Sequence, residues 1–241
     1  MAWWQKFDSP AAAWLRRVIM RQRDEGSPEP AFQQYISPEV VAAVAAAMRR
    51  GGEVRELTVL FLNIRGFLSL SGRLEPAQIV ELMNECLTEI TNVIQSHAGT
   101  VDKFIGDAVM VLYNAPLESP DHALKAVQTA LELQERAQGL SRRFGRAIRC
   151  GVGISTGDAF VGNIGSTQRM QYGAVGYTVN LASRLQSLTE KYNAPIVISE
   201  TTHQHLAGRI PTRELGDIVP KDMTRPVKIF AVLTSAGNGE V

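Results

Sequence analysis

The run from Glu56 to Ile64 limits the possible folds of this chain more than any other segment. It is almost continuously apolar, and such a run predicts a central β-strand that is covered by protein on both faces. Residues 75–97 then place apolar side chains on one stripe at helical spacing, which predicts a long amphipathic helix. The chain is therefore expected to build a sheet with helices packed on it.

The next segments continue the alternation of strand and helix. A hairpin is expected around residues 100–113, with Gly106 and Asp107 at its tip. Ser119 and Pro120 are expected to cap a second long helix, because serine commonly caps helices and proline is tolerated in a first turn.

Two strands are predicted after this helix, at 147–154 and 158–163, with a turn at Gly157 and Asp158 between them. The order strand, helix, two strands, helix, strand is typical of the ferredoxin-like βαββαβ fold, which belongs to the α+β class. Additional C-terminal elements are predicted as a helix near 177–191, a strand at 195–198, a short helix, and strands near 209–215 and 226–233.

Composition excludes several classes of function. The 25 Lys and Arg residues balance 24 Asp and Glu residues, so no basic footprint indicates a nucleic-acid partner. Cys86 and Cys150 lack metal-ligand spacing and are predicted to be structural thiols. The four histidines show no convergent metal spacing, and His203 and His205 are expected at the surface. No membrane span or signal peptide is visible, which favours a cytoplasmic protein.

Three regions are predicted along the chain. Residues 1–35 form an N-terminal amphipathic helical segment and linker, residues 36–235 form the main domain, and residues 236–241 form a disordered tail. The first segment mixes aromatic and basic side chains, so it could lie peripherally on an anionic membrane surface, pair with a second copy, make a regulatory contact, or pack on its own domain.

Three motifs carry candidate chemistry. Ile64, Arg65, Gly66 and Phe67 follow a strand and open toward a helix, so their backbone N–H groups could hold phosphates. A carboxylate at a hairpin tip, such as Asp107, suits a Mg²⁺ ion shared with those phosphates, although it could also be a solvated turn residue. Asn180 and Arg184, in turn, lie four residues apart on a predicted helix and can therefore point at one spot, or form an ordinary exposed face.

Together, the runs at 57–68, 100–112 and 172–184 resemble the class III adenylyl and guanylyl cyclases of bacterial type, over about residues 36 to 233. These enzymes convert a nucleoside triphosphate into a 3′,5′-cyclic nucleotide and pyrophosphate by two-metal catalysis. The resemblance implies a cyclase palm that forms a head-to-tail homodimer, in which metal ligands of one subunit meet the Lys, Asn and Arg of the other. It also implies two Mg²⁺ or Mn²⁺ ions per site.

The resemblance assigns roles residue by residue. The metal ligands are implied at Asn63, Ile64 and Asp107, where the family's first aspartate is replaced by Asn63. Asn180 orients the ribose, and Arg184 stabilises charge on the phosphate. Nucleotide-binding positions are implied at Ile64, Arg65, Gly66, Phe67, Lys103, Gly173, Tyr177 and Lys221, with Lys103 reading the base and Lys221 contacting the triphosphate.

Different functions remain open at this stage. ATP is the default substrate because Lys103 is present, and the uncharged Asn63 is expected to weaken catalysis. A pyrimidine nucleotide is an alternative, because Gly173 and Tyr177 stand where the family usually has base-pocket carboxylates or threonine. A catalytically silent domain that binds nucleotide or dimerises is the third hypothesis.

Overall fold

The computed structural model describes residues 51–65, 75–145, 147–166, 168–219 and 226–234. The predicted N-terminal segment of residues 1–35 and the predicted tail of residues 236–241 lie outside these ranges. Among the described helices, none is long and apolar enough to cross a membrane.

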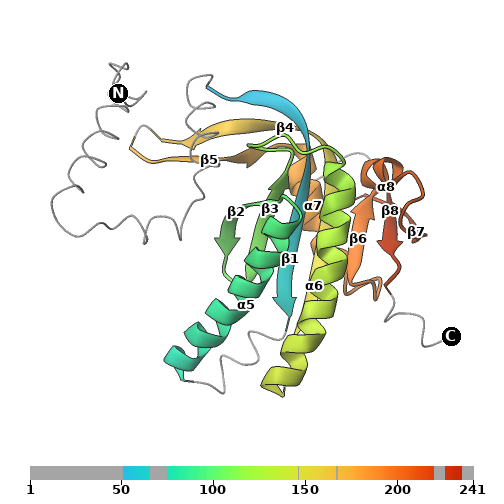
Figure 1. Ribbon diagram of the computed structural model, residues 1–241. Helices are drawn as coiled ribbons and strands as arrows, with labels where there is room; N and C mark the ends of the chain where they lie inside the picture. Colours follow the sequence, from blue (N-terminus) through green and yellow to red (C-terminus); the bar gives the residue numbers. More distant parts are fainter. Residues whose placement is uncertain (1–50, 66–74, 146, 167, 220–225, 235–241) are drawn as a thin grey trace. The chain divides into compact units, whose positions relative to one another are not determined.

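The described elements follow the predicted βαββαβ order and then continue with further strands and helices (Figure 1). The α+β fold class is confirmed. The elements are β1 (Glu53–Arg65), α5 (Pro76–Ser96), β2 (Thr100–Ile105), β3 (Ala108–Tyr113), α6 (His122–Phe144), β4 (Arg149–Gly165), β5 (Met170–Val175), α7 (Tyr177–Leu188), β6 (Ile196–Ser199), α8 (Glu200–Leu206), β7 (Thr212–Ile218) and β8 (Val227–Val232).

One sheet of 8 strands, in the order β2-β3-β1-β4-β6-β8-β7 with β5 paired to β4, contains every strand of the described residues. β1 lies between β3 and β4 and pairs antiparallel with both. Its pairing with β4 extends over the whole of β1, from Glu53 opposite Val161 to Arg65 opposite Arg149. The apolar run from Glu56 to Ile64 is therefore part of a central strand, as expected.

The two faces of β1 bury different side chains. Leu60, Leu62 and Ile64 pack into a core with residues of α5 and α6, which lie side by side on one face of the sheet (Figure 1). Leu57 and Val59 alternate with them and pack with Val179 and Ala182 of α7 on the other face. This alternation fixes the register of β1, because a shift by one residue would exchange the two faces.

The region around Gly157 corrects the sequence prediction. Residues 149–165 form one continuous strand, β4, whereas a turn was expected at Gly157 and Asp158. Gly157 has φ of 154°, and it stays paired with Leu57 of β1. Glycine accommodates this conformation within the strand, so its presence does not end the strand. The hairpin instead closes after Gly165, leading into β5, which was not predicted.

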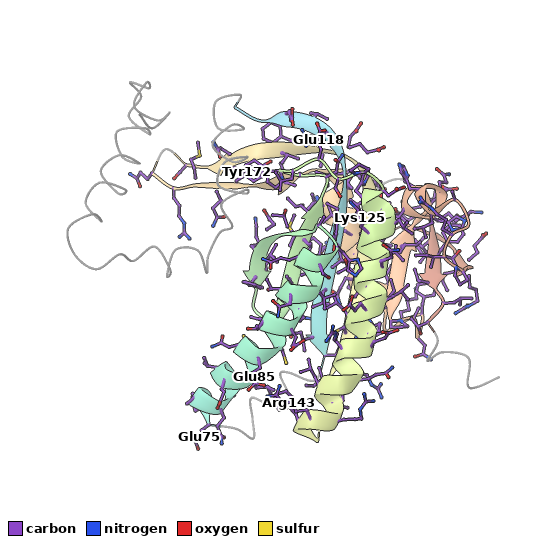
Figure 2. The ribbon with its side chains drawn as sticks, viewed as in Figure 1. Glu75, Glu85, Glu118, Lys125, Arg143 and Tyr172 are labelled. Atoms are coloured by element: carbon purple, nitrogen blue, oxygen red, sulfur yellow. The ribbon has the colours of Figure 1, made fainter. Side chains whose placement is uncertain are left out.

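The start of α6 also differs from the expectation. The helix begins at His122, with Asp121 as its N-cap at a φ of 55°, rather than at Ser119 and Pro120. Ser119 is buried, and its hydroxyl accepts a hydrogen bond of 3.0 Å from Lys125 Nζ (Lys125 is labelled in Figure 2). Ser119 therefore binds the first turn of the helix through a side chain and does not cap it.

Both cysteines are buried, as predicted for structural thiols. They belong to the core beneath α5 and α6. Burial raises the pKa of the Cys150 thiol to about 12, so this group stays protonated and unreactive at neutral pH.

Close packing of α7 on β4 yields a stability prediction. A Cβ on Gly153 would lie 2.1 Å from the backbone nitrogen of Gln186 and 2.3 Å from the carbonyl oxygen of Ala182. Because both neighbours are helix backbone, Gly153→Ala should lower the free energy of unfolding by about 3 kcal/mol. Urea unfolding followed by circular dichroism measures this change.

Gly139→Ala serves as the matched control. A Cβ at Gly139 meets no atom within 4 Å, and the residue lies inside α6, so alanine should stabilise the domain by about 0.5–1 kcal/mol. Equal effects of the two substitutions would contradict the close approach of α7 to β4.

Candidate active site

The main chains at Asn63 and Asp107 lie on adjacent segments near the C-terminal end of β1. Asn63 pairs with Ala108 of β3 and with Gly151 of β4, and its side chain is half-buried. The backbone N–H of Ile64 donates to the carbonyl oxygen of Asp107 at 3.0 Å. Because Gly106 adopts φ of 63°, the two-residue turn at the hairpin tip is tight and holds Asp107 against β1.

The side chains of Asn63 and Asp107 both offer oxygen atoms as potential metal ligands. Asp107 contributes a carboxylate and Asn63 an amide, and Ile64, next to Asn63 in β1, has its main chain tied to Asp107. Oxygen donors of this type fit hard divalent cations such as Mg²⁺, which rely on one or two carboxylates together with substrate phosphates. The set carries one negative charge, because the amide of Asn63 is neutral.

A second group of residues forms around a bulge in β2. Val101 pairs with Val111 and Lys103 pairs with Met110, so Asp102 is the extra residue that opposes no partner of its own. A bulge of this kind re-aims side chains, and adjacent residues can then point to the same side. Asp102 Oδ2 lies 3.1 Å from Lys103 Nζ.

Gly173 of β5 faces this ion pair. A Cβ built on Gly173 would lie 3.0 Å from Asp102 Oδ1 and 3.6 Å from Lys103 Nζ. The Asp102 carboxylate therefore fills the space that a side chain at position 173 would need. The structure thus brings Lys103 and Gly173 together and adds Asp102 to them.

The electrostatics of Asp102 and Lys103 differ. The Asp102 side chain is 2% exposed, whereas that of Lys103 is 38% exposed. Burial raises the pKa of Asp102, and the hydrogen bond and charge of Lys103 act in the opposite direction. Lys103 therefore stabilises the buried carboxylate while its ammonium group stays accessible.

Asn180 and Arg184 lie on the exposed side of α7. The helix begins at Tyr177, and Thr178 Oγ1 donates to the carbonyl oxygen of Asp158 at 2.8 Å, which fixes the first turn on β4. Leu181 and Leu185 face the core, whereas Tyr177, Asn180 and Arg184 are exposed. The predicted helix and its two faces are confirmed, so Asn180 and Arg184 share one side of α7.

The motif at Ile64–Phe67 predicts a phosphate contact at Arg65, but the Arg65 side chain contacts residues of the protein itself. Its guanidinium donates to Thr189 Oγ1 and lies 3.5 Å from the carboxylate of Glu190, just beyond α7. These contacts hold the end of β1 to α7. Gly66 and Phe67, like Lys221, lie outside the described residues.

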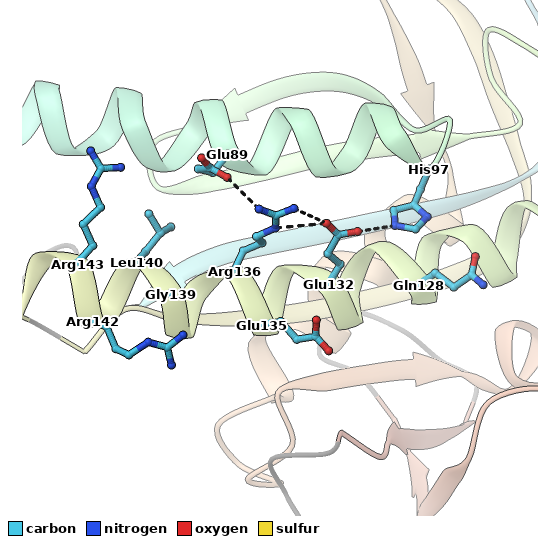
Figure 3. A pocket seen from close by; sticks show the side chains of 10 residues that line it. All are labelled: Glu89, His97, Gln128, Glu132, Glu135, Arg136, Gly139, Leu140, Arg142 and Arg143. Atoms are coloured by element: carbon cyan, nitrogen blue, oxygen red, sulfur yellow. Dashed lines mark hydrogen bonds and ion pairs between the residues drawn. The ribbon is translucent and has the colours of Figure 1, made fainter.

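A cavity of about 660 Å³ lies on the helical side of the domain, between α5 and α6 (Figure 3). None of the predicted site residues lines it. Its charged groups largely satisfy one another, because Glu132 binds His97 at 3.0 Å and Arg136 at 3.0 Å. The cavity is thus separate from the residues assembled around β1, β2 and β5.

Sequence reasoning missed Asp102. The signal was present, because two adjacent polar residues in an otherwise alternating strand indicate that the alternation is interrupted. Its position against Gly173 could not be foreseen, since β5 itself was not predicted.

Comparison with known proteins identifies the family. Residues 51–230 match the model of the adenylate and guanylate cyclase catalytic domain. Adenylate cyclase 1 of Rhizobium meliloti is 31% identical over 209 residues, which cover 84% of this chain and 31% of that protein. The chain thus spans about a third of the length of this curated relative.

Solved structures of cyclases resemble this chain as well. The adenylyl cyclase CyaB from P. aeruginosa is 35% identical with a TM-score of 0.72, and the alignment covers 76% of this chain and 96% of that one. The guanylyl cyclase Cya2 is 34% identical with a TM-score of 0.66, covering 79% and 98%. With the family model matching most of its length and the βαββαβ sheet in place, this chain belongs to the adenylate and guanylate cyclase catalytic domain family.

Proposed function

We propose that this chain converts a nucleoside triphosphate, with ATP as the default substrate, into a 3′,5′-cyclic nucleotide and pyrophosphate. One observation carries the proposal: Asn63 and Asp107 lie on adjacent segments of main chain. The pairing of β1 with β3 and the hydrogen bond from the Ile64 N–H to the Asp107 carbonyl oxygen hold them there. Lys103 lies four residues before Asp107 on the same hairpin.

Asn63, Ile64 and Asp107 would hold Mg²⁺ or Mn²⁺. When bound, such ions neutralise the triphosphate and make the ribose 3′-hydroxyl a better nucleophile. The residues of this chain supply one carboxylate to that task, so we expect weaker catalysis than two carboxylates would give. A loss of about 3–5 kcal/mol in transition-state stabilisation corresponds to a rate roughly 10²–10⁴-fold lower.

Asn180 and Arg184 would act on the substrate from α7. In the proposed reaction, the ribose 3′-hydroxyl gives up its proton to solvent and its oxygen attacks the α-phosphorus. The bond from that phosphorus to the oxygen bridging to the β-phosphate breaks, and pyrophosphate leaves with that oxygen. Asn180 would orient the ribose, and the Arg184 guanidinium would bind the phosphate oxygens as charge develops on them. The exposure of both positions leaves them accessible to a substrate.

We further propose that the site is completed by a second copy in a head-to-tail homodimer. Large apolar side chains are exposed on the elements that carry the candidate site: Phe104, Ile105, Met170, Val175 and Tyr177. Covering such residues favours association, and a two-fold dimer would contain two equivalent sites.

The base pocket supports a second candidate, a pyrimidine nucleotide cyclase. Gly173 offers no side chain, and the Asp102 carboxylate occupies that space beside Lys103. A carboxylate and an ammonium group together can bind one donor and one acceptor, a pattern present on the edges of purines and pyrimidines alike. Family membership therefore does not identify the base. Measuring turnover of each of the four ribonucleoside triphosphates does.

Restoring the missing charge should raise activity. Asn63→Asp is expected to increase cyclic nucleotide formation by about 10²-fold or more, because a second carboxylate stabilises the metal-bound transition state. The measurement is separation of products by liquid chromatography after incubation with each of the four ribonucleoside triphosphates and Mn²⁺.

Asn84→Asp is the matched control, since it adds the same charge to an exposed position of α5. It should leave turnover unchanged. Absence of a cyclic product from every triphosphate, in both the parent and Asn63→Asp, would contradict the enzyme assignment and favour the silent nucleotide-binding domain.

Removing the charge of Asp102 should alter the choice of base. Asp102→Asn keeps the shape of the side chain but releases Lys103 from its ion pair, so the ratio of kcat/KM between the best and second-best triphosphate should change by about tenfold. Asp217→Asn, on the exposed surface of β7, is the control. Identical ratios in the parent and Asp102→Asn would exclude Asp102 from base recognition.

Mixing two inactive variants tests the shared site. In the Asn63→Asp background, Asp107→Ala and Arg184→Ala should each be inactive alone, yet recover up to about a quarter of the activity when mixed, because half of the dimers are mixed and each then has one intact site. Lack of recovery, with subunit exchange demonstrated by a tagged pull-down, would place the whole site within one chain.

A further inference from the structure

Three potential metal ligands converge at the opposite end of β1 from Asn63. Glu56 lies near the start of β1, His122 is the first residue of α6, and His205 belongs to α8. One ligand atom of each lies within 4.8 Å of the others. Glu56 precedes Asn63 by seven residues of extended strand, about 23 Å at 3.3 Å per residue, so this cluster is separate from the candidate active site.

The distances suit a shared ion better than hydrogen bonds. Glu56 Oε1 lies 3.6 Å from His122 Nε2 and 3.4 Å from His205 Nε2. Both distances exceed the 2.7–3.2 Å of ordinary N–H···O hydrogen bonds. Ligands of a tetrahedral zinc ion, with bonds of about 2.0–2.1 Å, lie about 3.3 Å apart, close to the observed separations.

Neighbouring groups orient the two imidazoles. His205 Nδ1 lies 2.9 Å from the carbonyl oxygen of Thr201, which can only accept, so Nδ1 carries a proton and Nε2 is the nitrogen that presents the lone pair in the neutral imidazole. His122 Nδ1 lies 2.7 Å from Thr58 Oγ1. Outer contacts of this kind are what orient histidines that bind metals.

Thr58 is the first member of a buried chain of hydroxyl groups. Its Oγ1 lies 2.8 Å from that of Thr156, which is 2.9 Å from that of Thr202, which is 3.0 Å from Ser199 Oγ. Each hydroxyl can accept one proton and donate its own to the next. The chain can therefore take the Nδ1 proton of His122 as a hydrogen bond and leave Nε2 facing Glu56.

His122 is buried, and a cavity lies beside it. Burial lowers the pKa of His122, although the nearby Glu56 carboxylate acts in the opposite direction. A cavity of about 370 Å³ is lined in part by Arg55, Asn114 and His122, so it borders one of the three ligands. Arg209 pairs with Asp121 at 3.0 Å and donates to the carbonyl oxygen of His205 at 3.2 Å, which holds the ends of α6 and α8 together.

We propose that Glu56, His122 and His205 form a binding site for a transition-metal ion of the zinc type, with a water molecule able to complete the tetrahedron. Imidazole nitrogen with one carboxylate is a donor set that suits Zn²⁺ and Co²⁺ and differs from the oxygen donors at Asn63 and Asp107. Because the ligands come from β1, α6 and α8, a bound ion links three elements and stabilises the folded domain by mass action.

Co²⁺ is the probe, because tetrahedral Co²⁺ with nitrogen ligands absorbs visible light strongly. The whole chain is freed of metal with a chelator and kept in millimolar Mg²⁺, which occupies sites built from oxygen donors. We expect one equivalent of Co²⁺ to give a saturable tetrahedral spectrum that Zn²⁺ abolishes. Glu56→Gln and His205→Ala should each weaken binding by about tenfold or more.

His97→Ala is the matched control, because His97 pairs with Glu132 at 3.0 Å but, among the described residues, belongs to no group of three potential metal ligands. Its Co²⁺ affinity should equal that of the parent. Zn²⁺ should raise the melting temperature of the parent and not that of Glu56→Gln, a conservative change at a half-exposed side chain. The proposal is overturned by the lack of a tetrahedral spectrum in the parent, or by equal affinity in the parent and both ligand variants.

Discussion

β1 is hydrogen-bonded along its length to β4 on one side and over its second half to β3 on the other. This double pairing satisfies the backbone of a strand whose side chains are buried on both faces, where unpaired polar groups would be costly. It also fixes positions at both ends of the strand. Asn63 is set beside the tip of the β2–β3 hairpin, and Glu56 is set beside α6 and α8.

Negative charge is distributed unevenly among the residues of the candidate active site. At the C-terminal end of β1, Asp107 is accompanied by an amide where the family resemblance places a second carboxylate, so the site has less negative charge with which to bind cations. In β2 of the same hairpin, the bulge at Asp102 adds a buried carboxylate next to Lys103 and Gly173. Negative charge is thus absent at Asn63, in the proposed metal site, and present at Asp102, in the proposed base site. Under the proposed function, the first is expected to affect activity and the second to affect substrate choice.

Local patterns predicted the order of elements well, because apolar periodicity reports directly which side chains are buried. The hairpin tip at Gly106 and Asp107 and the exposed positions of Asn180 and Arg184 on α7 agree with the expectation. The turn expected at Gly157 was wrong, since pairing with β1 continues through this glycine. With a turn expected at Gly157, β5 was not predicted, and neither was the position of Gly173 against Asp102. Glycine permits a turn but does not require one, so only the neighbouring strand decides.

The sequence by itself determined the fold class, the central strand and the residues resembling those of nucleotide cyclases, because each depends on neighbours within one segment. Only the tertiary structure decided which distant segments meet. The four histidines show no metal spacing along the chain, yet His122 and His205 lie with their ring centroids 5.8 Å apart and Glu56 between their Nε2 atoms. These residues belong to a strand and two helices that are far apart in sequence, and the packing of α6 and α8 against the sheet brings them together. No local periodicity encodes such a contact, because it is set by how whole elements pack.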